Sequence, residues 1–161
     1  MSAIRALGTP HVPSIIPVLN PLMRRLIGAG LPLGPNVLLT VRGRSSGQPR
    51  TFPVAILELD GRRFVQSPFG EVNWVRNLRA SGEAVVTRGH TRTTVDAIEL
   101  DPESSGPILR DALAPYLRSR LMAPLARWLL HLRTESTLED FVREAHRHPM
   151  FELRPRTDRS D

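Results

Sequence analysis

The chain of 161 residues contains no cysteine. This absence excludes disulfide bonds, thiolate catalysis, iron–sulfur clusters and cysteine-ligated zinc, and it fits a protein of the reducing cytoplasm. Redox chemistry would therefore need a bound cofactor. Lysine is absent as well, so all 22 basic residues are arginine and Schiff-base chemistry is excluded.

Long apolar runs and aromatic residues are also scarce. No apolar run approaches the roughly 20 residues of a membrane-spanning helix, and the N-terminus lacks a compact apolar core followed by a cleavage site. We therefore expect neither a spanning nor a secreted protein. Only 5% of the residues are aromatic and no nucleic-acid-binding motif is present, so nucleic acid is not an expected partner despite the net charge of +6.

The composition is that of one soluble globular domain, because 40% of the residues are apolar and 24% are charged. The basic residues carry more specific information. Arginine keeps its charge at any physiological pH, and its planar fork suits phosphate or carboxylate groups. The charge balance therefore favours anionic partners, although any single arginine is more often a solvated surface residue.

Short runs of β-branched and apolar residues predict five strands in an α+β domain. Asp60 and Gly61 form a tight-turn dipeptide, and the short linkers indicate mostly antiparallel pairing in a split β-barrel. The linkers leave no room for a βαβ dinucleotide fold. A sixth short run before the polar tail is expected to return as an edge strand. These runs are 36–41, 51–59, 63–67, 84–87, 91–100 and 150–153.

Apolar residues at helical spacing predict helices at both ends of the chain and one helix between the third and fourth strands. The expected helices cover about 21–27, 73–79, a segment opening at 101–102 with a helical pattern that continues through 132, and a last helix ending at 145. Ser136 to Glu139 has the form of a capping box for that last helix. The expected organisation is a helical extension at 1–35, the barrel at 36–154 and a polar tail at 155–161.

The segment from Arg42 to Arg50 is the strongest candidate for a binding site. Two glycines permit a tight turn with exposed amides, two serines add hydroxyl groups, and three arginines flank them. Together these groups form a nest suited to phosphate. A solvated hairpin is the alternative. In a second segment, Trp74 and Asn77 lie one helical turn apart, and there the alternative is that Trp74 fills the core while Asn77 caps a strand.

The stretches LLTVRGRSSGQPR (38–50) and NWVRNL (73–78), with the ending HPMF (148–151), resemble the deazaflavin-dependent nitroreductase and quinone reductase family. The resemblance implies an FMN-binding-like split barrel of flavin-reductase type, with the 8-hydroxy-5-deazaflavin coenzyme F420 as cofactor and FMN as the less favoured alternative. By position it implies cofactor-binding roles for Arg44, Ser45, Ser46, Gln48, Arg50, Ser67, Trp74 and Asn77.

The chain also departs from the family pattern, as a divergent branch would. Reductases of the family commonly carry a lysine after the second arginine of the motif and another after the serine of the third strand. This chain has Ser45 and Pro68 at those positions. The resemblance therefore implies weaker and more salt-sensitive cofactor binding than in lysine-bearing relatives.

The implied activity is hydride transfer from reduced deazaflavin to an activated alkene, a quinone or a nitro-type acceptor, with no side chain assigned as catalytic. The alternative is a non-catalytic binder of an apolar ligand on the same fold. It would touch the inner face of the membrane through the N-terminal helix. A homodimer is expected by analogy only. His131, His146 and His148 lack a carboxylate at ligand spacing, so no metal site is expected.

Overall fold

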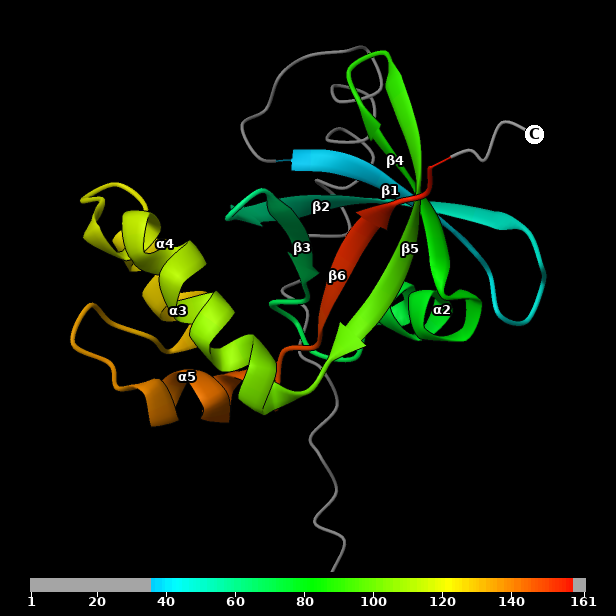
Figure 1. Cartoon of the computed structure of the whole chain (residues 1–161). Coiled ribbons are helices and arrows are strands. Elements are labelled where there is room, and N and C mark those ends of the chain that lie inside the picture. The colour runs from blue at the N-terminus through cyan, green and yellow to red at the C-terminus, as the bar shows by residue number, and fades with distance from the viewer. Residues whose placement is uncertain (1–35, 158–161) are drawn as a thin grey trace, which may run out of the picture.

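The computed structural model describes residues 36–157, without the side chain of Leu129. Six antiparallel strands form a closed barrel in the order β1-β2-β3-β6-β5-β4 (Figure 1). The strands are β1 (Asn36–Arg42), β2 (Pro49–Leu59), β3 (Arg62–Gln66), β4 (Glu83–Arg88), β5 (Thr91–Leu100) and β6 (Met150–Pro155). The helices are α2 (Asn73–Ser81), α3 (Pro102–Arg118), α4 (Ala123–Leu130) and α5 (Leu138–Ala145).

The predicted α+β barrel is confirmed, including the tight turn between β2 and β3 and the helix α2 between β3 and β4. Asp60 and Gly61 both adopt left-handed backbone angles, with φ of 51° and 73°. Such a pair matches the twist of an antiparallel hairpin. The expected N-terminal helix and most of the polar tail lie outside the described residues.

The prediction that β6 is an edge strand is wrong. β6 pairs with β3 on one side and with β5 on the other, and these two ladders close the barrel. Its first four side chains are all buried, so both of its faces are covered. Phe151 and Leu153 point into the barrel, whereas Met150 packs among the helices outside it. A strand covered on both faces belongs to the interior of a sheet.

The barrel interior is filled by alternate residues of the strands, and α2 covers one end of it. Trp74 and Leu78 of α2 pack into the same cluster as Leu39 of β1. The Trp74 ring lies 6.3 Å from the Phe151 ring at a tilted angle of 54°. These contacts fix α2 beside the end of β1, which positions the segment containing Asn77.

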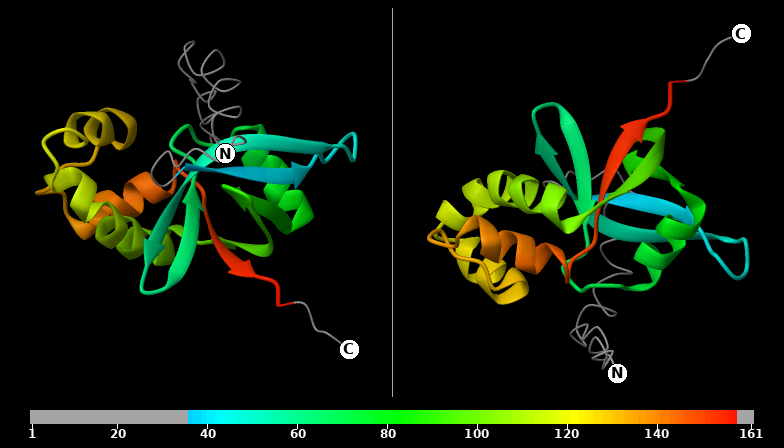
Figure 2. Two further views of the ribbon diagram at one scale, coloured as in Figure 1. Left: turned by 90° about the horizontal axis from the view of Figure 1, so that it is seen from above. Right: turned by 60° about the horizontal axis from the view of Figure 1, so that its bottom comes forward.

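A second cluster joins α3, α4 and α5 to the outside of the barrel, where Phe64 of β3 packs against Leu109 and Phe141. The right-hand view of Figure 2 shows these helices gathered on one side of the barrel. The expected continuous helical pattern to residue 132 is interrupted, because the chain leaves α3 at Ser119 and starts α4 at Ala123. None of the described helices is both long enough and apolar enough to span a bilayer.

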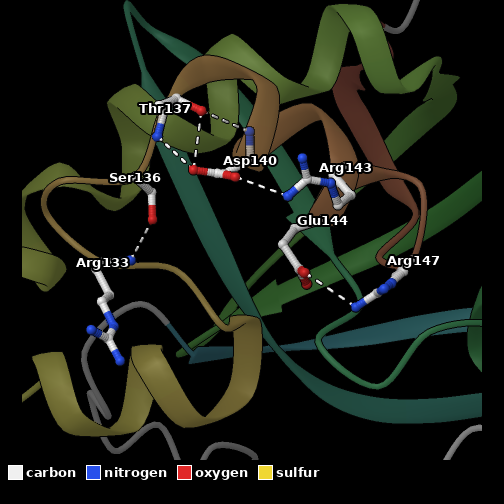
Figure 3. Close-up of polar contacts among 7 residues, drawn as sticks. All are labelled: Arg133, Ser136, Thr137, Asp140, Arg143, Glu144 and Arg147. Atoms are coloured by element: carbon white, nitrogen blue, oxygen red, sulfur yellow. Dashed lines mark hydrogen bonds and ion pairs between the residues drawn. The ribbon is translucent and has the colours of Figure 1, made fainter.

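The cap of α5 lies one residue later than the sequence pattern indicates. The Thr137 hydroxyl accepts a hydrogen bond from the Asp140 amide, and the Asp140 carboxylate accepts one from the Thr137 amide (Figure 3). Ser136 instead accepts a hydrogen bond from the Arg133 amide. The neighbouring Ser and Thr residues both precede an acid by three positions, so spacing alone could not choose between them.

Glu152 of β6 is the main buried carboxylate of the barrel wall. Arg62 donates two hydrogen bonds to it at 3.0 and 2.8 Å, and Arg154 donates a third at 3.0 Å. The side chain of Glu152 is only 7% exposed. These hydrogen bonds, from Arg62 first and Arg154 second, lower the pKa of Glu152 from 4.5 to about 2.

Replacing Glu152 by Gln should therefore reduce the free energy of unfolding at pH 7 by about 1.5–3 kcal/mol. The pKa of the carboxyl is lower in the folded than in the unfolded chain. Its contribution is therefore present above pH 4.5 and disappears as the pH falls towards 2. Denaturation curves of Glu152→Gln and the wild-type chain should converge over that interval. Glu58→Gln, at a carboxylate 58% exposed, is the control and should change stability little. A constant difference at every pH would contradict the assignment.

Candidate functional site

The hairpin between β1 and β2 is held in a defined shape by its own backbone. The Gly43 amide donates to the Gln48 carbonyl at 2.8 Å, and the Gly47 amide donates to the Gly43 carbonyl at 2.9 Å. Gly47 has a left-handed φ of 70°. A Cβ on Gly43 would lie 2.9 Å from the Ser46 hydroxyl and 3.1 Å from the Gln48 carbonyl oxygen. The turn therefore requires glycine at residue 43.

The donors left available by this hairpin are fewer than the sequence indicates. The amides of Gly43 and Gly47 bond within the turn, and the Gln48 amide donates to the Ser46 hydroxyl oxygen at 3.3 Å. Within residues 36–157, no acceptor is recorded for the amides of Ser45 and Ser46. Because the Ser46 oxygen accepts from Gln48, its own hydroxyl hydrogen remains free to donate. The amides and hydroxyl groups of Ser45 and Ser46, which are both exposed residues, are thus available to a ligand.

Arg44 connects the hairpin to α2. Its guanidinium Nη1 donates to the Asn77 side-chain oxygen at 2.8 Å, and its backbone amide donates to the same oxygen at 3.3 Å. Asn77 is only 5% exposed, whereas Arg44 is exposed. The carboxamide therefore anchors one edge of the guanidinium and leaves its other N–H groups for a ligand. The hydrogen bond from the Arg44 amide fits the alternative in which Asn77 caps a strand, because Arg44 lies just beyond the end of β1, and the guanidinium contact is additional to it.

The three arginines of the hairpin do not share one face. Arg50 is paired with Val41, whose side chain is buried in the barrel, and Arg42 is paired with Pro49. Paired residues lie on the same side of a sheet, so Arg42 and Arg50 lie on opposite sides. The Arg50 Cγ atom and the Ser46 hydroxyl flank the same point above Gly43. The stem of Arg50 thus lies near Ser46, and Arg42 extends from the opposite side of the sheet.

The hairpin arginines are also free of carboxylate partners. No acidic residue occurs between 36 and 57. Across residues 36–157 no ion pair involves Arg42, Arg44 or Arg50, whereas nine other arginines pair with carboxylates. Unneutralised guanidinium groups beside free amides are suited to a phosphate or carboxylate ligand.

A shallow depression of about 290 Å³ lies on the outer face of the barrel beside the hairpin. Its walls combine polar and apolar side chains of β1, β4 and β5 with the hairpin backbone. Glu83 is its acidic residue, and Arg156 neutralises that carboxylate at 2.9 Å. The lining residues are Thr40, Val41, Arg42, Gly47, Pro49, Glu83, Ala84, Val85 and Thr94.

Two of the expected site residues are buried in structural contacts. The Ser67 hydroxyl donates to the Gly70 carbonyl at 2.6 Å, and the Ser67 amide donates to the Pro149 carbonyl at 2.9 Å. Trp74 is 8% exposed and packs in the barrel interior, as the core-filling alternative predicts. The structure therefore brings Asn77 to the hairpin residues, while Ser67 and Trp74 support the elements around them.

Sequence reasoning missed a buried pair behind Ser67. His148 donates from Nδ1 to the Ser67 carbonyl at 3.1 Å, and its Nε2 lies 3.1 Å from the Glu144 carboxylate. Arg147 also bonds Glu144 at 3.4 Å (Figure 3). Burial lowers the pKa of His148, and the Glu144 carboxylate opposes that shift.

The prediction that these histidines lack a carboxylate at ligand spacing is wrong for His148, because Glu144 stands four residues before it and contacts its ring. The i to i+4 spacing was the available signal. Among residues 36–157, no three His, Asp or Glu side chains are grouped to hold a metal ion. The pair instead attaches the end of α5 to the turn that leads into α2.

Solved structures share this fold at low sequence identity. An F420-H2-dependent reductase named FDR-A is 21% identical, with a TM-score of 0.50, and the match covers 74% of this chain and 93% of that one. A protein of unknown function from Agrobacterium tumefaciens is 18% identical, with a TM-score of 0.54, covering 93% of this chain and 60% of that one. A domain-swapped dimer is 19% identical, with a TM-score of 0.51, covering 83% and 94%. No curated protein matches.

The match to a sequence family is more specific. Residues 23–115 match the F420H(2)-dependent quinone reductase family, over more than half of the chain. This region includes the hairpin 42–50 and α2, which Arg44 and Asn77 join. F420 is the cofactor of this family, and the activity is that of an oxidoreductase. With its six-stranded barrel and its arginine-flanked hairpin, the chain belongs to the F420H2-dependent quinone reductase family.

Proposed function

We propose that the hairpin between β1 and β2 holds the phosphate and acidic tail of F420. Arg44, Ser45, Ser46, Gln48 and Arg50 are the residues we assign to it. The observation that carries this proposal is the unneutralised guanidinium pair. Arg44 is anchored by Asn77, the stem of Arg50 lies near Ser46, and neither arginine forms an ion pair within residues 36–157. A polyanionic tail is the complement of such a donor set.

We further propose that an electron-poor apolar acceptor, of the quinone, activated-alkene or nitro type, is reduced here. Bound reduced deazaflavin supplies a hydride to that acceptor. The chain contributes position and environment. The hairpin fixes the cofactor tail, and the depression beside Arg42, on the outer face of the barrel, offers Pro49 and Val85 as apolar wall. The family match supports the quinone class of acceptor.

The cofactor roles of Ser67, Trp74 and Asn77 remain predictions. Their contacts support a positioning role: Trp74 fastens α2 to the barrel, Asn77 holds Arg44, and Ser67 fixes the turn before α2. A homodimer also remains a proposal, supported by the domain-swapped dimer among the structural relatives. The proposed membrane contact of the N-terminal helix concerns residues outside the described range.

Arg50→Ala should weaken F420 binding by about one to two orders of magnitude, because one charge-assisted contact to the tail is lost. Fluorescence titration with F420 measures this effect. Arg63→Ala is the matched control. Arg63 belongs to β3 and lies opposite Glu58, near the end of β2 that is far from the hairpin, and it forms no ion pair within residues 36–157. Equal affinity of Arg50→Ala and the wild-type chain would remove the hairpin from the cofactor site.

Asn77→Asp should separate cofactor binding from stability. The new carboxylate would still accept both hydrogen bonds from Arg44, so the melting temperature should be retained or raised. It would also neutralise the guanidinium that we assign to the cofactor tail, so F420 affinity should fall about tenfold. If the affinity is unchanged, Arg44 does not contact the anion.

Restoring the two family lysines should strengthen cofactor binding. Ser45→Lys together with Pro68→Lys adds two positive charges, so F420 should bind more tightly at low ionic strength. Turnover with a quinone should rise in the same variant. Matched circular dichroism spectra and melting curves are the control, because Pro68 constrains the turn before α2. A folded double variant that still binds no F420 would contradict the reductase proposal for this site.

A further inference from the structure

Helix α4 is apolar on both of its faces. Ala123, Ala126 and Leu130 face the body of the protein, and Ala126 and Leu130 pack in the cluster shared with α3. The opposite face exposes Leu125 at 48% and Trp128 at 60%. A helix that is apolar all round is normally covered on every side, by protein or by lipid. Within residues 36–157, nothing covers the outer face of α4.

The turn before α4 extends this outer face. Leu121 is 86% exposed and Met122 is 37% exposed. Together with Leu125 and Trp128 they form what we call the α4 face, with spacing that places them along one side of the helix. Six large apolar side chains of the described residues are exposed, and four of them belong to this face. Such clustering marks an interaction surface.

The stretch of sequence that carries the α4 face is rich in basic residues. No Asp or Glu occurs from 112 to 134, whereas Arg118, Arg120, Arg127 and Arg133 all lie in that interval. Arg118, Arg120 and Arg127 are exposed, and no ion pair is recorded for them within residues 36–157. The partner must therefore offer an apolar layer next to negative charge.

We propose that the α4 face docks on the surface of a membrane containing anionic lipid. Leu121, Leu125 and Trp128 would enter the boundary between headgroups and acyl chains, and the arginines would meet the lipid phosphates. Apolar side chains that enter the interface and cations that meet anionic headgroups are the two contributions that bind a peripheral protein to such a surface. A second copy of this chain is a poorer occupant, because a symmetric contact would bring two arginine-rich rims together without a carboxylate between them.

The docking orientation would keep the cofactor hairpin in water. Figures 1 and 2 show α4 and the β1–β2 hairpin at opposite ends of the molecule in each view. An anionic cofactor tail would thus approach from the aqueous side and avoid the negative headgroups. The proposal does not depend on the cofactor assignment, because lipid binding is measured without F420.

The test uses the full chain with vesicles of phosphatidylcholine alone or mixed equally with phosphatidylglycerol. The wild-type chain should sediment with the anionic vesicles, and sedimentation should decrease at high salt. Trp128 fluorescence should shift to the blue on binding, since the other tryptophan, Trp74, is already buried. Absence of binding to anionic vesicles would overturn the proposal.

Two variants test the α4 face itself. Arg120→Gln with Arg127→Gln should lower the vesicle partition coefficient about 30-fold, at roughly fivefold for each arginine near an anionic surface. Leu125→Ser with Trp128→Ser should lower it at least about tenfold. The matched controls are Arg88→Gln with Arg92→Gln on the β4–β5 hairpin, and Leu138→Ser at an apolar side chain 43% exposed. The controls should bind vesicles as the wild-type chain does.

The α4 variants should keep the wild-type melting temperature and F420 affinity. If they bind vesicles as tightly as the controls, another segment carries the lipid contact and the proposal fails. It also fails if the wild-type chain is dimeric and Leu125→Ser with Trp128→Ser makes it monomeric, because the α4 face would then be a protein interface. Loss of F420 binding in Arg50→Ala leaves the vesicle result unaffected, so the two proposals can fail separately.

Discussion

Closure of the barrel depends on the pairing of β6 with β3 and β5. These ladders join residues 63–66 and 95–100 to the end of the described chain. Phe151 gives Trp74 its aromatic neighbour, and Met150 joins the helical cluster to the barrel. Glu152, bridged by two arginines, secures the same strand. Strand β6 therefore closes the barrel, gives α2 an aromatic contact and joins the helical cluster to the barrel wall.

The hairpins could be predicted from local sequence because their signals are local. The Asp60–Gly61 turn and the β-branched runs give the strands and their antiparallel direction. The position of β6 could not be predicted, because a four-residue run is consistent with either an edge or a closing strand. Only long-range packing distinguishes these cases, through the helices that bury its outer face. The N-cap of α5 was predicted at Ser136 instead of Thr137 for a similar reason, since both residues precede an acid by three positions.

The candidate site was predicted in part. The glycine, serine and arginine pattern identified the hairpin, and the one-turn spacing of Trp74 and Asn77 identified α2. Their connection through Arg44 spans 33 residues and appears only in three dimensions. The separation of Arg42 from Arg50 follows from strand register, which the sequence left open. The Glu144 and His148 pair was visible as an i to i+4 spacing, but its burial depends on the fold.

The arginine-only chemistry of the hairpin and of the α4 face has a consequence for regulation. A lysine surface can be neutralised by acetylation, which removes the charge and a hydrogen-bond donor. Guanidinium groups offer no such amine, and methylation of arginine leaves the charge in place. Neither surface loses charge within the physiological pH range. The hairpin and the α4 face therefore keep their positive charge under conditions in which acetylation would neutralise a lysine surface. Ionic strength and competing anions are then the variables that can change their attraction for anions.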